Sequence, residues 1–455
     1  MAGCCNDFSR TELFRRAAAE AGSGLPAIEP GMPTPAGTGL SRRRFLARSA
    51  GLALAVYGGG RLSSALLDDG IAQAAAGPTA PVLVSVFLEG GADSMSILFP
   101  AGDARYQALR PKLALPATAG IRFEEDERLF WHPATAPLAA LHAEGKVTVL
   151  PAIGYDHPDK SHFTSRHFWE VGATDSSLLT GWLGRYLDVT GTPDNPLQGL
   201  SLDPRLQPAL ASARVPVASL DGPDRYGFAI PKLELEGRLV EAVGRLGEAH
   251  AKSSDPALRL AGSTAVQVQR LRTQLAPFSG SASTNPYPRS SKDDFPLRLQ
   301  GLAQMLAAGL PLHCVAMRAP GMYDTHSAQA GALDDGLKLT ADSLLAFQRD
   351  LEHRGLADRV LVHVWSEFGR RAKENGSLGT DHGAAGIGFL IGTRVRGRMI
   401  GEFPGLASGL DEQGNLRPTA DFRGVYSALL EQWLGTDASR VIPNAGAYAR
   451  PALLR

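Results

Sequence analysis

The sequence predicts an α/β fold in which a mostly parallel central sheet carries helices on both faces. The first observation is a set of short apolar runs without alternation, such as residues 81–88 and 146–155, which are typical of strands buried on both sides. The second is that helical patterns alternate with these runs, as they do when helices cover a parallel or mixed sheet. The third is the composition, 44% hydrophobic and 20% charged, which suits a globular protein with a large core.

Each expected element follows from its local pattern. Residues 81–88 form an apolar strand that ends just before Gly90 and Gly91, and residues 146–155 form a second one. Between them, residues 132–145 have helical spacing and end at Gly145, where a glycine C-cap is expected. The later elements are a helix, a turn and a strand over 302–321, a longer helix and a strand over 337–369, a strand over 385–395, and an amphipathic C-terminal helix over 423–435.

Residues 77–455 are expected to form one α/β domain with an irregular middle segment. Residues 196–295 show no clear period and are predicted to be an insertion that shapes a cap over a site. Within them, residues 279–294 read SGSASTNPYPRSSKDD, a polar, Ser-rich composition that is typical of an exposed loop.

The first 76 residues are predicted to be a disordered extension followed by a signal peptide. Residues 41–46 read Ser-Arg-Arg-Arg-Phe-Leu and resemble the twin-arginine export signal. The apolar run over 47–57 is too short and too Gly-rich for a membrane span, and small-x-small cleavage sites follow at 72–74 and 74–76. The mature protein is therefore expected in the periplasm or secreted, with the twin-arginine translocase as a partner during export. The alternative is a capped cytosolic helix with an arginine cluster.

Charge and cysteine content exclude two classes of protein. The 46 basic and 46 acidic side chains leave no net charge, which argues against a nucleic-acid binder. Three cysteines are too few for a disulfide scaffold. Cys4 and Cys5 lie in the predicted leader, so Cys314 is predicted to be a small core residue.

Acids, imidazoles and hydroxyls follow the expected strands. In open α/β sheets, ligands bind beyond the carboxyl ends of the strands, so these loops are the candidate site. A solvated acid or a capping serine is the alternative interpretation of each residue taken singly. The candidates are Glu89 and Asp93 after the first strand, Asp156, His157, Asp159, Ser161 and His162 after the second, Asp324 and His326 after the third, Ser366, Glu367 and Arg370 after the fourth, and Asp381 and His382 before the fifth.

These residue types favour a metal site and an activated hydroxyl. Mixed carboxylate and imidazole ligands suit Zn²⁺, Mn²⁺ or Fe, whereas all-oxygen sets suit Ca²⁺ or Mg²⁺. Ser161 is the hydroxyl best placed as a nucleophile, because it opens a predicted helix whose free N–H groups favour an anion. The alternative for Ser161 is a plain N-cap. The sequence has no CxxC pair, HExxH helix, G-x-S-x-G elbow or full dinucleotide fingerprint, so the corresponding sites are not predicted.

Several segments together resemble the exported proteins of domain-of-unknown-function family 1501. The similarity covers roughly residues 81–435 and is loosest in the middle third. It is carried by FLEGGADSMS (87–96), SHFTSRHFWEVG (161–172), GWLGRYLD (181–188), YDTH (323–326), SEFGRRAKENGSLGTDHG (366–383) and PTADFRGVYSALLEQWLG (418–435). That family in turn is similar to the alkaline phosphatase and sulfatase superfamily, which implies an alkaline-phosphatase-like fold and hydrolysis of phosphate or sulfate esters at a two-metal site.

The resemblance also implies roles for particular residues. Ser161 would be the nucleophile. Apart from the resemblance, Arg370 is predicted to bind the anionic group bidentately. The sequence departs from the superfamily pattern at the first acid, which falls at Glu89 or Asp93. It also departs at Ser366-Glu367, where an acid remains but the second-metal histidine is missing. The metal ligands implied are Asp93, Asp324, His326, Glu367, Asp381 and His382.

The leading hypothesis is an exported, metal-dependent hydrolase of a small anionic phosphate or sulfate ester. The expected cofactor is a divalent metal, Zn, Mn, Ca or Mg. A second hypothesis is a non-catalytic exported binding or assembly protein with an exported partner protein, which the missing second-metal histidine favours. A periplasmic solute binder is a third interpretation of the same sequence.

Overall fold

The computed structural model describes residues 32–36, 54–57, 80–192, 195–203, 205–220, 236–255, 258–259, 261–262, 265–266 and 286–455. The chain divides into two compact units. One unit, here called the site unit, consists of Pro81–Thr174, Asn285–Leu299 and Met317–Arg455. All of the predicted site residues belong to it.

The site unit is built on a mixed, mostly parallel sheet. Its strands lie in the order β2 (Val82–Phe87), β10 (Val360–Trp365), β13 (Gly386–Ile391), β6 (Val147–Gly154) and β14 (Ala420–Asp421). Strand β13 alone runs antiparallel to its neighbours, whereas β2 pairs parallel with β10 and β14 pairs parallel with β6. Every residue of β2, β6, β10 and β13 is buried, which explains the apolar runs in the sequence.

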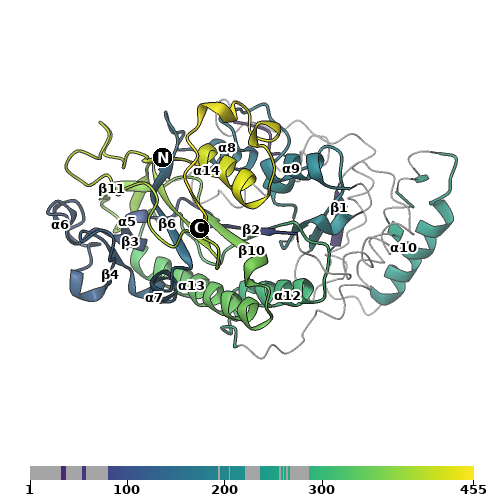
Figure 1. The fold of residues 1–455 in the computed structure, drawn as a ribbon, viewed down its shortest axis with the longest axis horizontal. Coiled ribbons are helices and arrows are strands. Elements are labelled where there is room, and N and C mark those ends of the chain that lie inside the picture. Colours follow the sequence, from purple (N-terminus) through teal and green to yellow (C-terminus); the bar gives the residue numbers. More distant parts are fainter. Residues whose placement is uncertain are drawn as a thin grey trace. The chain divides into compact units, whose positions relative to one another are not determined.

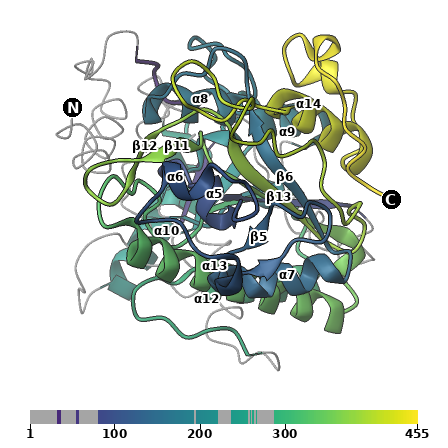
Figure 2. The ribbon, with the colours of Figure 1, turned by 90° about the vertical axis from the view of Figure 1, so that its left-hand side faces the viewer.

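Helices cover both faces of this sheet (Figures 1 and 2). Helices α7 (Ala136–Ala143) and α13 (Gln329–His353) lie on one face, and α8 (His162–Val171) and α14 (Phe422–Ala428) lie on the other. Trp169 of α8 stacks on Trp365 of β10 at 5.6 Å and on Phe422 of α14 at 4.6 Å. These contacts pack the layer of α8 and α14 against the sheet. The predicted fold class is confirmed.

Short elements at the carboxyl ends of the strands complete the site unit. Helix α5 (Ser94–Ile97) follows β2, and helix α6 (Tyr106–Leu109) comes next. Strands β3 (Leu98–Phe99), β5 (Phe130–Trp131) and β4 (Ile121–Arg122) form a small separate sheet. Strands β11 (Arg370–Glu374) and β12 (Thr380–His382) form an antiparallel ribbon that follows β10. This ribbon was not predicted from the sequence.

The second unit has a sheet in the order β1 (Leu54–Tyr57), β8 (Val217–Leu220), β7 (Gly199–Ser201) and β9 (Cys314–Arg318). It also contains helices α9 (Trp182–Thr190) and α10 (Glu236–His250), and α12 (Phe295–Ala307) precedes β9. Part of the predicted irregular insertion is therefore regular, because β7, β8 and α10 fall within it. Cys314 is a buried free thiol, as predicted, and burial raises its pKa.

The predicted leader falls almost entirely outside the described residues. Within it, the structure describes residues 32–36 and strand β1, which pairs antiparallel with β8. Among the described helices, none combines the length and apolar character needed to cross a bilayer.

Candidate metal centre

Two glycines after β2 bring the loops of the site together. Gly90 and Gly91 have φ angles of 117° and 70°, which glycine adopts readily. A Cβ on Gly90 would collide with the backbone of Asp324, so only glycine allows the two segments to approach this closely. Asp324 therefore lies directly beside the end of β2.

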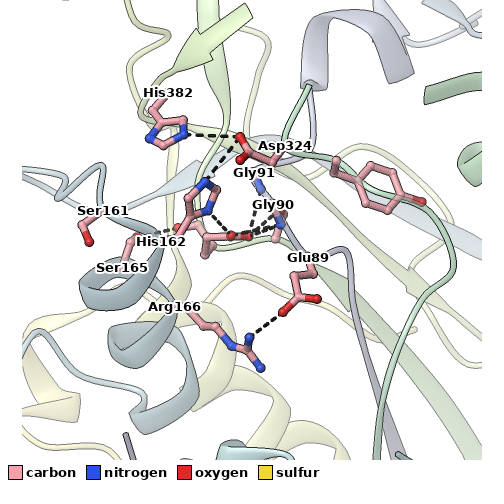
Figure 3. A network of polar contacts seen from close by, with 12 residues as sticks. Glu89, Gly90, Gly91, Ser161, His162, Ser165, Arg166, Asp324 and His382 are labelled. Carbon is pink, nitrogen blue, oxygen red and sulfur yellow. Dashed lines mark hydrogen bonds and ion pairs between the residues drawn. The ribbon is translucent and has the colours of Figure 1, made fainter. Parts of the chain in front are cut away.

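The first turn of α8 supplies a histidine to the same place. Ser161 is the N-cap, and its hydroxyl accepts hydrogen bonds from the backbone N–H groups of Phe163 and Thr164 at 3.2 and 3.4 Å. The cap fixes where the helix begins, so His162 is its first residue. His162 is only 4% exposed and points toward Asp324 (Figure 3).

Three imidazoles converge on one carboxylate oxygen. The Nε2 atoms of His326, His162 and His382 lie 3.1, 3.4 and 3.5 Å from Asp324 Oδ1. The Nε2 atoms of His326 and His382 are also 3.0 Å apart. The ligand atoms of His162, Asp324 and His382 all lie within 4.8 Å of one another, a spacing that can hold a metal ion.

The opposite nitrogen of each imidazole faces an oxygen acceptor. His162 Nδ1 is 2.8 Å from Glu367 Oε1, and His382 Nδ1 is 2.7 Å from the carbonyl oxygen of Lys160. His326 Nδ1 is 3.4 Å from Asp381 Oδ1. An acceptor at Nδ1 favours the tautomer with its hydrogen there, which leaves the Nε2 lone pair directed at the centre of the cluster.

The electrostatics of Asp324 agree with a cationic environment. Burial alone would raise the pKa of this carboxyl group, but the surrounding imidazoles of His162, His326 and His382 hold the pKa well below its usual value. Arg370 Nη2 also donates to Asp324 Oδ1 at 2.7 Å. Asp324 is therefore ionised at neutral pH and is available as a ligand of a cation.

The structure brings together Asp324, His326 and His382, three of the residues predicted from the sequence. Asp381 lies at the edge of this cluster, where its 51% exposed side chain contacts His326 and Asn375. Glu367 lies behind His162 and is fully buried, so its carboxylate orients that histidine and has no direct place among the converging atoms.

Arg370 has a different role from the predicted one. Its guanidinium group is 0% exposed, and it donates to the carbonyl oxygens of Gly90, Gly91, Tyr323 and Thr380 as well as to Asp324. These donors are used to hold the loops of the site together. The prediction that Arg370 binds an anion bidentately is therefore corrected to a structural clamp.

Two acids expected near a metal are paired with arginines. Asp93 is 0% exposed and forms a bidentate ion pair with Arg110, with nitrogen–oxygen distances of 2.5 and 2.9 Å. The positive charge of Arg110 offsets burial and lowers the pKa of Asp93. Glu89 pairs with Arg166 at 2.7 Å and with Arg318 at 2.8 Å. Asp93 is therefore corrected from a metal ligand to a member of an internal ion pair.

Ser161 has the plain N-cap role that was the alternative to a nucleophile. Figure 3 shows its hydroxyl pointing away from Asp324 and His382. His162 is among the candidates expected after the second strand, but the predicted active role falls on its neighbour Ser161. A signal was available, because an N-cap hydroxyl is turned back toward the helix backbone and the next side chain is free to project elsewhere.

The family pattern described as "Protein of unknown function (DUF1501)" matches residues 153–442. The chain belongs to this family. The matched range includes α8, Asp324, Glu367 and His382, so it contains all of the converging residues. No curated protein matches the sequence.

Several solved structures are similar to the chain. A protein in the alkaline phosphatase superfamily from Vibrio parahaemolyticus has 9% identity and a TM-score of 0.39, with 96% of this chain and 78% of that chain covered. The PsFucS1 sulfatase from Pseudoalteromonas sp. has 10% identity and a TM-score of 0.35, with 85% and 76% covered. The C-terminal periplasmic domain of EcEptC from Escherichia coli, in complex with Zn, has 9% identity and a TM-score of 0.36, with 80% and 87% covered. Sequence identities and TM-scores this low give no information about the activity of this chain.

Proposed function

We propose that this chain is an exported, metal-dependent hydrolase of phosphate or sulfate esters. The observation that carries the proposal is the convergence of three Nε2 atoms on Asp324 Oδ1, with an acceptor facing each Nδ1. Lone pairs that face one another at 3.0 Å, as in His326 and His382, repel unless a cation or a proton lies between them. A mixed set of imidazole and carboxylate ligands suits Zn²⁺ or Mn²⁺.

His162, Asp324 and His382 would hold the metal, because these three offer ligand atoms within 4.8 Å of one another. A bound divalent cation would polarise the ester group and offset the negative charge that develops during hydrolysis. One metal is proposed in place of two, because the additional acids that a second site would need, Glu89 and Asp93, are neutralised by arginines.

His326 is the residue best suited to act as general base. It is the most exposed of the three histidines, at 33%, and Asp381 faces its Nδ1 at 3.4 Å. A carboxylate in that position stabilises an imidazole that has accepted a proton at Nε2. In the proposed reaction, water attacks the phosphorus or sulfur atom, His326 accepts the proton that water loses, and the ester oxygen leaves and is protonated to an alcohol.

The direct test uses the purified mature chain. Inductively coupled plasma mass spectrometry measures bound metal after incubation with Zn²⁺ or Mn²⁺, and aryl phosphate and aryl sulfate esters measure hydrolysis. We expect about one metal ion per chain, and activity that is lost in Asp324→Asn and on chelation. The absence of both bound metal and hydrolysis in the wild-type chain would sink the proposal.

A non-catalytic binding or assembly protein is the second candidate. Arg370 favours it, because its bond to Asp324 supplies a positive charge to the cluster without any metal. This candidate predicts a metal-free chain that co-purifies with an exported partner protein.

Export itself is tested through the predicted leader. We expect the double substitution Arg42→Lys and Arg43→Lys to retain the full-length chain in the cytoplasm, whereas the wild-type chain is recovered in the periplasmic or secreted fraction. Equal recovery of both chains outside the cytoplasm would contradict the twin-arginine route.

A further inference from the structure

A buried polar network connects Asp93 to two of the three segments that carry the metal centre. Its hub is Gln329, the first residue of α13, which is only 1% exposed. Gln329 Oε1 accepts hydrogen bonds from the hydroxyls of Thr325 at 2.9 Å and Thr380 at 2.6 Å. Gln329 Nε2 donates to Asp93 Oδ2 at 2.6 Å. All of the hydrogen-bonding capacity of the amide oxygen is therefore used on two threonines from different segments.

The two threonines lie close in sequence to residues of the proposed metal centre. Thr325 lies between Asp324 and His326, and Thr380 lies two residues before His382. The backbone N–H of Thr380 also donates to the carbonyl oxygen of Thr325 at 3.1 Å. Gln329 thus connects the loop that carries Asp324 and His326 to the strand that carries His382.

We propose that Gln329 is a positioning residue that sets the spacing of Asp324 and His326 relative to His382, and that Asp93 and Arg110 fix the orientation of its amide. The metal readout of this proposal rests on the function proposed above. The proposed effect on the histidine side chains does not rest on that function, because these side chains are held in place by the chain itself.

The orientation of the amide follows from charge. Asp93 is held ionised by Arg110 and is therefore only an acceptor, so it must face the NH₂ group of Gln329. The amide oxygen then faces the two threonine hydroxyls, which donate to it. A flipped amide would put an oxygen against the carboxylate and would take away the acceptor of the buried Thr380 hydroxyl, a cost of about 1–3 kcal/mol for an unsatisfied group.

The backbone at this junction is strained, as is common where a site is held in place. Ala328 and Leu378 have φ angles of 45° and 58°, a region that residues with a side chain seldom adopt. The N–H groups of Ala328 and Gln329 donate to the carbonyl oxygens of Ser377 and Leu378 at 3.0 and 2.8 Å. These bonds attach the start of α13 to the loop that leads into Thr380.

The test compares two glutamines of the same helix. Gln329→Leu removes the hub, and Gln348→Leu is the matched control, because Gln348 is also 1% exposed on α13 but bonds to Glu352 outside the site. We expect both variants to lose stability, but only Gln329→Leu to raise the Kd for Zn²⁺, by about 10- to 100-fold as for other residues that orient ligands. Isothermal titration calorimetry measures the Kd.

A second readout needs no metal. Nitrogen-15 NMR of the histidine rings in the metal-free chain reports which ring nitrogen carries hydrogen. We expect His326 and His382 to change in Gln329→Leu and to stay unchanged in Gln348→Leu. If the wild-type chain binds no metal, the proposed function fails and this comparison alone decides the role of Gln329.

The orientation of the amide is tested by Gln329→Glu. The new carboxylate still accepts from both threonine hydroxyls, but it sets an oxygen against Asp93 Oδ2 in place of an N–H group. We expect Gln329→Glu to raise the Kd for Zn²⁺ and to change the histidine spectrum, as Gln329→Leu does. Unchanged affinity and spectra in Gln329→Leu would overturn the proposal.

Discussion

His162 Nδ1 lies 2.8 Å from Glu367 Oε1, and both side chains are buried. The same carboxylate accepts hydrogen bonds from the backbone N–H groups of Gly90 and Gly91 at about 3.0 Å. One acid therefore joins the start of α8 to the loop after β2. Its carboxylate also favours the tautomer of His162 whose Nε2 lone pair points toward Asp324.

The first prediction concerns Glu367→Gln. The new amide turns an NH₂ group toward donors of the backbone or of His162, so we expect the free energy of unfolding to fall by about 1–3 kcal/mol. The Kd for Zn²⁺ should rise by about 10- to 100-fold. Urea unfolding and calorimetry measure the two effects. Glu170→Gln is the control, because Glu170 is a buried acid bonded to Arg166, and there we expect lower stability with unchanged Zn²⁺ affinity.

The second prediction separates the metal ligands from the general base. His382→Ala removes a proposed ligand, so the Kd for Zn²⁺ should rise by at least about 100-fold. Loss of a residue that only orients a ligand raises the Kd by about 10- to 100-fold, so loss of the ligand itself should have at least the larger effect. His326→Ala should keep the Kd within a few-fold of wild type but lower kcat by about 100- to 10,000-fold. If His326→Ala loses metal as completely as His382→Ala, His326 is a ligand and the assignment of the base is wrong.

The fold was largely predictable because burial leaves a simple pattern. Strands β2, β6 and β13 are buried on both faces, and each is a continuous apolar run in the sequence. The antiparallel direction of β13 was not predictable, since an apolar run has no direction. The β11–β12 ribbon was missed because its residues, RRAKE and TDH, are polar and lack the composition of a buried strand.

The candidate site was predictable only in part. Asp324, His326 and His382 were found because they follow or precede strands at the edge where ligands bind. Asp93 pairs with Arg110 17 positions later, and Arg370 bonds to carbonyl oxygens up to 280 positions away, and both pairings depend on how the folded chain packs. No local pattern distinguishes a carboxylate that will meet an arginine from one that will meet a cation.

The third prediction tests Ser161 as a cap against Ser161 as a nucleophile. Ser161→Ala should lower the free energy of unfolding by about 1 kcal/mol, because the N–H groups of Phe163 and Thr164 lose their acceptor. Ser161→Asn should restore most of that stability, since asparagine is also a good N-cap. Ester hydrolysis should persist in both variants. Complete loss of activity in Ser161→Ala with metal still bound would restore the nucleophile assignment.

The fourth prediction concerns His363, which lies in the middle of β10 and is fully buried. Among the described residues, neither of its ring nitrogens has a hydrogen-bond partner, and its ring meets the edge of Tyr426 at 5.6 Å. Burial lowers the pKa of His363 from 6.5 to about 3. Between these pH values the unfolded chain binds a proton at this position and the folded chain does not.

Stability should therefore fall as the pH drops from 6.5 toward 3, by roughly 1.4 kcal/mol per pH unit from this one group. Urea unfolding of the metal-free chain at pH 6.0 and 5.0 measures the change. His363→Leu should lose this part of the pH dependence, so its free energy of unfolding should fall less than that of wild type over the same interval. His353→Leu, at an exposed histidine on α13, is the control and should keep the wild-type slope. Equal slopes for wild type and His363→Leu would mean that His363 is protonated in the folded chain or has a partner there.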